Sequence, residues 1–214
     1  MKIDDGRYVL GLISEGEHQQ QDFKYKITDA IKLARSVSAF ANTDGGRLLI
    51  GVRDDGVVSG VRSEEEIYMM HAAAFKYCRP AASIKFDTYH VSGKTVVIAT
   101  VPPALHKPIC ALTSPDTYRA FIRIDDENII ASPIQIQLWK DEQSQKGVLL
   151  QYTDVESDFL KLFEPDAKYH LGQIVRLSGM RRRSVICLLS RMIRFGLIHE
   201  EYQGDGLYLY GVHG

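Results

Sequence analysis

The sequence predicts an α+β N-terminal domain, built from a mixed sheet with hairpins and packed helices, followed by a small and mainly helical domain. Apolar strands alternate with helical segments in the earlier part of the chain, whereas helical periodicity dominates the later part. Between them, the stretch "WKDEQSQKG" at 139–147 is polar apart from Trp139 and has no apolar period. We therefore predict domains at 1–140 and 151–214, joined by a linker at 141–150.

The first predicted elements are a helix and a hairpin. The segment 29–41 has apolar residues most of the way round a helix, which indicates burial between two layers. The strand expected at 47–52 is followed by Arg53-Asp54-Asp55-Gly56, and Asp-Gly favours the turns that join hairpin strands. A second strand is therefore predicted at 56–61.

The rest of the first domain is again a mixture of helices and strands. Ser63 and Glu66 have the spacing of a capping box, which predicts a helix that begins near Glu64 and ends before Arg79-Pro80. Ser132-Pro133 is typical of the cap and first turn of a helix. The remaining predictions are a hairpin of strands 83–91 and 95–101 that turns at Ser92-Gly93, a strand at 118–124 and a short helix at 132–139.

The C-terminal domain shows a run of helices followed by a two-stranded ribbon. In the third of these helices, apolar residues recur at the spacing of one helical face. The order of elements is typical of a winged helix-turn-helix, so the full fold prediction is an α+β domain followed by a winged helix-turn-helix domain. The predicted segments are helices at 153–163, 170–179 and 181–196 and a ribbon at 197–212 that turns at 204–206.

Composition excludes several classes of protein. The chain has 214 residues, of which 45% are hydrophobic and 25% charged, and its formal net charge of −1 indicates no polyanionic partner by itself. Three scattered cysteines, Cys78, Cys110 and Cys187, argue against a disulfide framework and against structural zinc. The apolar runs are too short to span a membrane, and the N-terminus lacks a signal-peptide core, so we expect a cytoplasmic protein without membrane contact.

Charge is distributed unevenly in the predicted helix-turn-helix. From Ala167 to His199 there are seven Lys or Arg and no Asp or Glu. Cations at a helix start oppose the helix dipole, whereas phosphate is attracted both to them and to the free amides there. A solvated face and a protein-binding winged helix remain as alternatives to nucleic-acid binding. The candidate nucleic-acid-binding residues of this domain are Arg176, Arg181, Arg182, Arg183, Ser184, Arg191 and Arg194.

A long motif in the first domain resembles the Schlafen AlbA-like family, also called the divergent AAA domain. The resemblance covers roughly residues 14–137. It implies nucleic-acid binding, which in bacteria is often combined with a helix-turn-helix in transcriptional regulators, and in animal Schlafens is accompanied by cleavage of tRNA and rRNA. The matching residues are Glu17, Asp22-Phe23-Lys24, Ala39-Phe40-Ala41-Asn42-Thr43, Gly45-Gly46, Ile50-Gly51-Val52, Asp54-Asp55-Gly56, Gly60, Lys107-Pro108 and Arg123.

The resemblance places Glu17, Asp22 and Asp54 at the three acids of the family. In a nuclease they would be both the catalytic residues and the ligands of Mg²⁺ or Mn²⁺, because converging carboxylates repel one another unless a cation or a proton is shared. Asp22 is one methylene shorter than the usual Glu, and Arg53 stands where the family often has Asp. Lys24 and Lys107 are added to the candidate nucleic-acid-binding residues.

Elementary backbone chemistry offers a structural interpretation of the same motif. Asn42 can cap the last carbonyls of the helix, and Gly45-Gly46 can supply positive φ angles. The favoured function is a DNA-binding transcriptional regulator, a homodimer that needs no cofactor for binding and prefers DNA to RNA. The alternatives are a divalent-metal-dependent ribonuclease that acts on tRNA or structured RNA, and an oligomerising scaffold with a protein-binding winged helix.

Overall fold

The computed structural model describes residues 5–61, 64–144, 153–204 and 206–211. It confirms a mixed α+β protein with several sheets and, among the described residues, seven helices. The chain divides into two compact units, Met1–Ala131 and Ser132–Gly214. This division lies before helix α4 (Pro133–Glu142), whereas the sequence placed this helix at the end of the first domain.

The first sheet of unit 1 contains four strands in the order β1-β2-β5-β4. Strand β1 (Gln21–Lys24) pairs in parallel with β2 (Gly46–Ile50), and the other pairs, β2 with β5 (Lys94–Val101) and β5 with β4 (Lys85–Val91), are antiparallel. The predicted hairpin of β4 and β5 is confirmed. Ser92 and Gly93 both have positive φ at its turn, as a tight hairpin turn requires.

A second antiparallel sheet has the order β3-β6-β7-β8. Only β7 (Thr117–Ile124) corresponds to a strand predicted from the sequence. The other strands have two to five residues, which is too short for an alternating pattern to stand out. They are β3 (Cys78–Arg79), β6 (Cys110–Ser114) and β8 (Glu127–Ile130).

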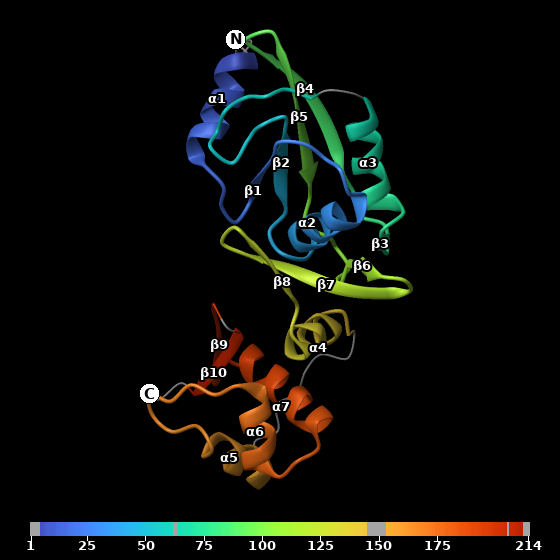
Figure 1. Cartoon of the computed structure of the whole chain (residues 1–214). Coiled ribbons are helices and arrows are strands. Elements are labelled where there is room, and N and C mark those ends of the chain that lie inside the picture. The colour runs from blue at the N-terminus through green and yellow to red at the C-terminus, as the bar shows by residue number, and fades with distance from the viewer. Residues whose placement is uncertain (1–4, 62–63, 145–152, 205, 212–214) are drawn as a thin grey trace. The chain divides into compact units, whose positions relative to one another are not determined.

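Helix α2 (Ala30–Asn42) packs between the two sheets, which confirms its predicted burial. Its core contacts include residues of β2 and β5 in one sheet and of β6 and β7 in the other. Helix α3 (Glu64–Phe75) shares this core, and α1 (Asp5–Glu15), which the sequence did not predict, covers the opposite face of the first sheet with Val9 and Leu12. Figure 1 shows α1 and α3 on opposite sides of β2 and β5.

Asn42 does not cap its helix as expected, because its side chain bonds to two other segments instead. Its amide nitrogen donates to the carbonyl oxygens of Ile109 (2.8 Å) and Phe121 (2.9 Å), and its amide oxygen accepts the Ile109 amide (2.7 Å). The side chain is 3% exposed. Of the two glycines that follow, Gly45 has the expected positive φ, while Gly46 is needed because a Cβ there would lie 2.3 Å from the Phe40 ring.

The predicted strand at 56–61 is wrong. Only one bridge, between Val52 and Val58, joins this segment to the chain before it. Gly51 has φ +90°, and its carbonyl oxygen accepts the amides of Ser59 and Gly60. This local turn uses hydrogen bonds that a strand would give to a neighbouring strand, so the Asp-Gly turn closes a loop and not a hairpin.

Unit 2 contains the helices and the ribbon that the sequence predicted. Helix α4 packs against α7, and their apolar residues share a core with the rest of the unit. Val155, which lies in the helix predicted at 153–163, is 56% exposed and does not face the core. The predicted linker begins inside α4, and its residues 145–150 lie outside the described residues. The remaining elements are α5 (Asp154–Leu160), α6 (Leu171–Ser178), α7 (Arg182–Arg194), β9 (Ile198–Gln203) and β10 (Gly206–Gly211).

None of the helices in the described part of the chain combines the length and the apolar character needed to cross a membrane.

We expect Asn42→Ala to lower the free energy of unfolding by about 3 kcal/mol, because the buried Ile109 amide and Phe121 carbonyl lose the side chain that binds them. Urea denaturation measures the change. Gln20→Ala, which removes an exposed hydrogen bond to the Asp44 carbonyl, is the control and should change stability far less. Equal effects of the two substitutions would contradict the role assigned to Asn42.

Candidate nucleic-acid interface and acidic cluster

The N-terminus of α7 presents a concentrated positive charge. Arg181, Arg182 and Arg183 are all exposed, and none of them forms an ion pair or side-chain hydrogen bond with another described residue. Arg181 is the cap residue, and no side chain caps the helix. The first intrahelical bond runs from the Val185 amide to the Arg181 carbonyl, so the amides of the first turn stay free for an anion. Ser184 is exposed beside them.

The other predicted cations of unit 2 divide into free and paired groups. Arg176 on α6 and Arg194 near the end of α7 are exposed. Arg191 is half-buried, and its guanidinium lies 3.6 Å from Glu156. The Thr153 hydroxyl is the main cause of a lowered pKa of Glu156, so this carboxylate is ionised and holds Arg191 away from the role of a free phosphate ligand.

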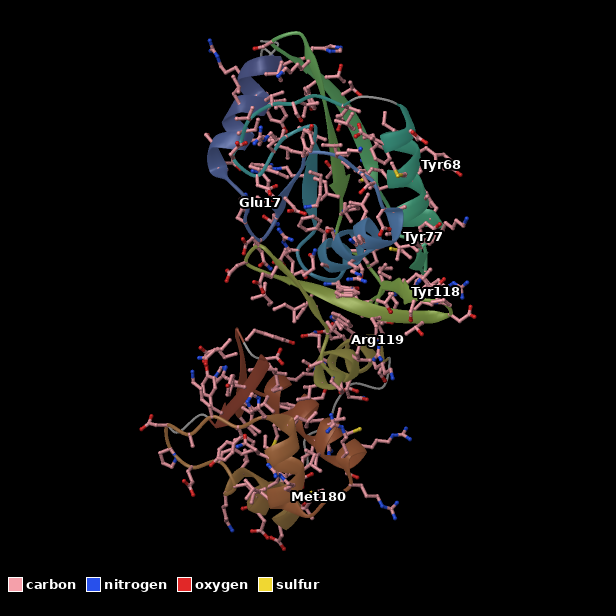
Figure 2. The ribbon with its side chains drawn as sticks, viewed as in Figure 1. Glu17, Tyr68, Tyr77, Tyr118, Arg119 and Met180 are labelled. Carbon is pink, nitrogen blue, oxygen red and sulfur yellow. The ribbon has the colours of Figure 1, made fainter. Side chains whose placement is uncertain are left out.

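In unit 1, Glu17 and Asp22 form a pair of acids at the edge of the first sheet. Glu17 lies in the segment between α1 and β1 (Figure 2), where its carboxylate accepts the Phe23 amide at 2.8 Å. Burial raises the pKa of Glu17, and a hydrogen bond to Asp22 raises it further. Asp22 is 5% exposed. The two carboxyl groups are therefore arranged to share a proton when Glu17 is protonated.

Two cations hold Asp22 on its other sides. The Lys24 ammonium lies 2.7 Å from one carboxylate oxygen of Asp22, and the Arg123 guanidinium lies 3.7 Å from the other. Arg123 is 1% exposed, stacks 5.1 Å from the Phe40 ring centroid and donates to Asn128 at 3.1 Å. The predicted Lys24 is thus engaged with Asp22, and it contacts neither Glu17 nor Asp54 through a described ion pair.

Asp54 and Lys107 do not join this pair of acids. Asp54 is exposed in the turn after β2, while Lys107 donates to the Thr43 carbonyl at the end of α2. Among the described residues, no group of three or more His, Cys, Asp or Glu is arranged to hold a metal ion. Glu17, Asp22 and Asp54 are thus not grouped as metal ligands in the described part of the chain.

The sequence did not single out Gln21, the residue before Asp22 in β1. Gln21 is fully buried, and its side chain donates to the carbonyls of Leu12 and Gly16 and accepts from Arg47. This ties α1 to β1 beside the acids. Gln21 could not be predicted to be buried, because it is the last of three consecutive glutamines in "HQQQD" and nothing in the sequence distinguishes it from the other two. Arg123 gave a clearer signal, because a charged residue inside the apolar run "FIRI" implies a buried partner.

Comparison with known proteins agrees with the motif. A family model described as Schlafen, AlbA_2 matches residues 17–132, which is more than half of the chain. The chain belongs to the Schlafen AlbA_2 family. The match covers Glu17 and Asp22, α2 and both sheets of unit 1, so the AlbA_2 domain corresponds to unit 1 without α1.

Two solved structures are similar to this chain over most of its length. The DIP2311 protein from Corynebacterium diphtheriae is 21% identical with a TM-score of 0.44, and the match covers 74% of this chain and 40% of that protein. The N-terminal domain of a RecG-related protein from Nitrosomonas europaea is 20% identical with a TM-score of 0.39, and the match covers 71% of this chain and 97% of that domain. This chain thus spans less than half of the Corynebacterium protein.

We expect Glu17→Gln to stabilise the AlbA_2 domain near neutral pH. A carboxyl group whose pKa is raised on folding holds its proton more tightly in the folded state, so the ionised form opposes folding. This cost is present above the folded pKa and disappears as the pH falls through it. The gain from glutamine, which keeps an oxygen for the Phe23 amide, should therefore shrink in acid.

Chemical denaturation at a series of pH values measures this dependence. Glu127→Gln, which changes an exposed acid of the same unit, is the control. A loss of stability in Glu17→Gln at every pH would show that the ionised carboxylate supports the fold.

Proposed function

We propose that this protein is a DNA-binding transcriptional regulator whose unit 2 is a winged helix-turn-helix, with α7 as the helix that enters the major groove. Membership of the AlbA_2 family suggests a nucleic-acid-binding role. The observation that carries the proposal is the group of exposed arginines at the start of α7, which have no ion-pair partner and no capping side chain among the described residues. Helix-turn-helix proteins commonly bind as dimers to two half-sites, so the proposal includes a homodimer.

Stability does not explain this arrangement. Three arginines at a helix N-terminus oppose the dipole, and the lack of a capping side chain leaves the first amides unsatisfied by protein. Arg191, the arginine of α7 that pairs with an acid within the described residues, lies later in the helix. A phosphate backbone would satisfy both the guanidinium groups and the amides, and the recognition helix of a helix-turn-helix contacts DNA with its N-terminal residues.

Replacement of Arg181, Arg182 and Arg183 by Ala should weaken binding to a mixed-sequence DNA duplex and reduce its salt dependence. Each lost phosphate contact lowers the slope of log K against log salt by about 0.9, so a change of about 2 to 3 is expected. Fluorescence anisotropy of a labelled duplex, repeated at several salt concentrations, measures both quantities.

The matched control replaces three exposed lysines of unit 1, Lys76, Lys85 and Lys94, by Ala. It removes the same charge and should leave the slope nearly unchanged. If the arginine variant stays folded and binds DNA as tightly as the control, α7 is not the helix that contacts DNA.

The same binding reactions distinguish the alternatives. With tRNA and structured RNA added to the panel and Mn²⁺ present, cleavage products would favour the ribonuclease. Absence of binding to any nucleic acid at low salt, together with concentration-dependent self-association, would favour the scaffold.

A further inference from the structure

We propose that unit 1 carries a second phosphate site, a pocket of about 200 Å³ at the start of α2 that receives the sugar-phosphate backbone of the same nucleic acid. This inference rests on the proposed nucleic-acid-binding function. Three lysines, Lys24, Lys26 and Lys32, line the pocket. We call it the lysine pocket.

The local fold brings these lysines together. Lys24 ends β1, Lys26 lies in the connection that follows, and Lys32 lies in the first turn of α2. Asp29 caps α2, and the chain turns there from the sheet edge into the helix. The lysines therefore come from three successive pieces of one short segment that surrounds the pocket.

The charge of the pocket is not neutralised by the acids around it. Asp29 is the acid in its lining, and one of its oxygens already accepts the amides of Ile31 and Lys32. Lys24 is paired with Asp22 at 2.7 Å. Lys26 and Lys32 are exposed, and neither ammonium has an ion-pair partner within the described residues. Two cations are thus left over for an anionic ligand.

The wall of the pocket adds a hydroxyl group that can donate to a phosphate oxygen. Ser36 is 4% exposed and lines the pocket. Its oxygen accepts the Asn128 side-chain amide at 3.0 Å, so its own proton is not used in that bond. Ile27 and Leu33 give the pocket an apolar surface next to these polar groups.

These groups select a class of ligand. Two free ammonium groups and a hydroxyl recognise phosphate oxygens, and an apolar wall accepts the carbon atoms of a sugar. Among the described residues, the lining holds none of the Arg, Asn and Gln side chains that commonly read base edges, and the proposed contact is to the backbone. The contact is therefore independent of sequence and depends on salt.

The test replaces Lys26 and Lys32 by Ala in the full chain and leaves Lys24, which holds Asp22, in place. The slope of log K against log salt for a mixed-sequence duplex should fall by about 1 to 2, and the affinity should drop by a similar factor on duplexes of different sequence. The control is Lys76→Ala with Lys85→Ala, which removes two exposed lysines elsewhere in unit 1. A thermal melt verifies that each variant is folded.

The outcomes separate this inference from the proposed function. If the double lysine variant binds like its control while the α7 arginine variant is weakened, the lysine pocket is refuted and the regulator stands. If DNA binding is weakened in the lysine variant and not in the arginine variant, the lysine pocket is supported and α7 is not the helix that contacts DNA.

A second measurement identifies the source of the phosphate. Inorganic phosphate alone is titrated into the wild-type chain and into the double lysine variant, and chemical shifts of the α2 amides are followed by NMR. Weak binding in the wild type only, together with the altered DNA slope, supports a backbone contact. Tight saturable binding of phosphate with an unchanged DNA slope would overturn it in favour of a small phosphorylated ligand.

Discussion

The architecture of unit 1 depends on directional hydrogen bonds made by the buried end of α2. Two sheets without a shared strand pack on this helix, and apolar contacts alone would let them slide. Ser38 and Asn42 fix them by bonding to backbone groups of the Ile109 and Phe121 segments. Thr43 continues the series, because its hydroxyl accepts the Arg123 amide at 2.9 Å. The main structural role of the family motif around Asn42 is therefore to attach α2 to the second sheet.

Next to these hydrogen bonds lies a buried ion pair, Asp22 with Arg123, which the stability of the fold does not by itself require. Arg123 and Asp22 are almost fully buried, and the Nε of Arg123 has no hydrogen-bond partner among the described residues. The desolvation free energy of a buried ion pair often exceeds the Coulombic attraction between its charges. Apolar residues of similar size can therefore stabilise a fold equally well. Because Asp22 also holds Lys24, and Asn128 links Arg123 to Ser36, the cluster reaches the wall of the lysine pocket. Its physical effect is to fix the groups that surround that pocket.

The sequence predicted the elements that carry their own local pattern and missed those that depend on distant contacts. Helix α7 was predicted correctly because its apolar period is uninterrupted, and the sequence has no Asp or Glu close to Arg181, Arg182 and Arg183. Helix α1 gave no signal, since its placement depends on Val9 and Leu12 packing against the sheet and on Gln21 bonding to its last turn. The pairing of Asp22 with Arg123 joins strands far apart in the chain, and no local spacing encodes it.

Although the net charge is only −1, each unit carries a group of exposed cations: Lys26 and Lys32 in unit 1 and Arg181–Arg183 in unit 2. A chain of this composition has no strong general attraction for polyanions, so any affinity has to come from local groups whose charge is not neutralised by neighbours. Arg191 with Glu156 and Lys24 with Asp22 show what neutralised cations look like in this protein. Arg181–Arg183, Lys26 and Lys32 differ from them, because none of these side chains forms an ion pair with another described residue. On the proposal that both sites contact one continuous backbone, binding at either site raises the local concentration of phosphate at the other, so two individually weak contacts would give appreciable binding together.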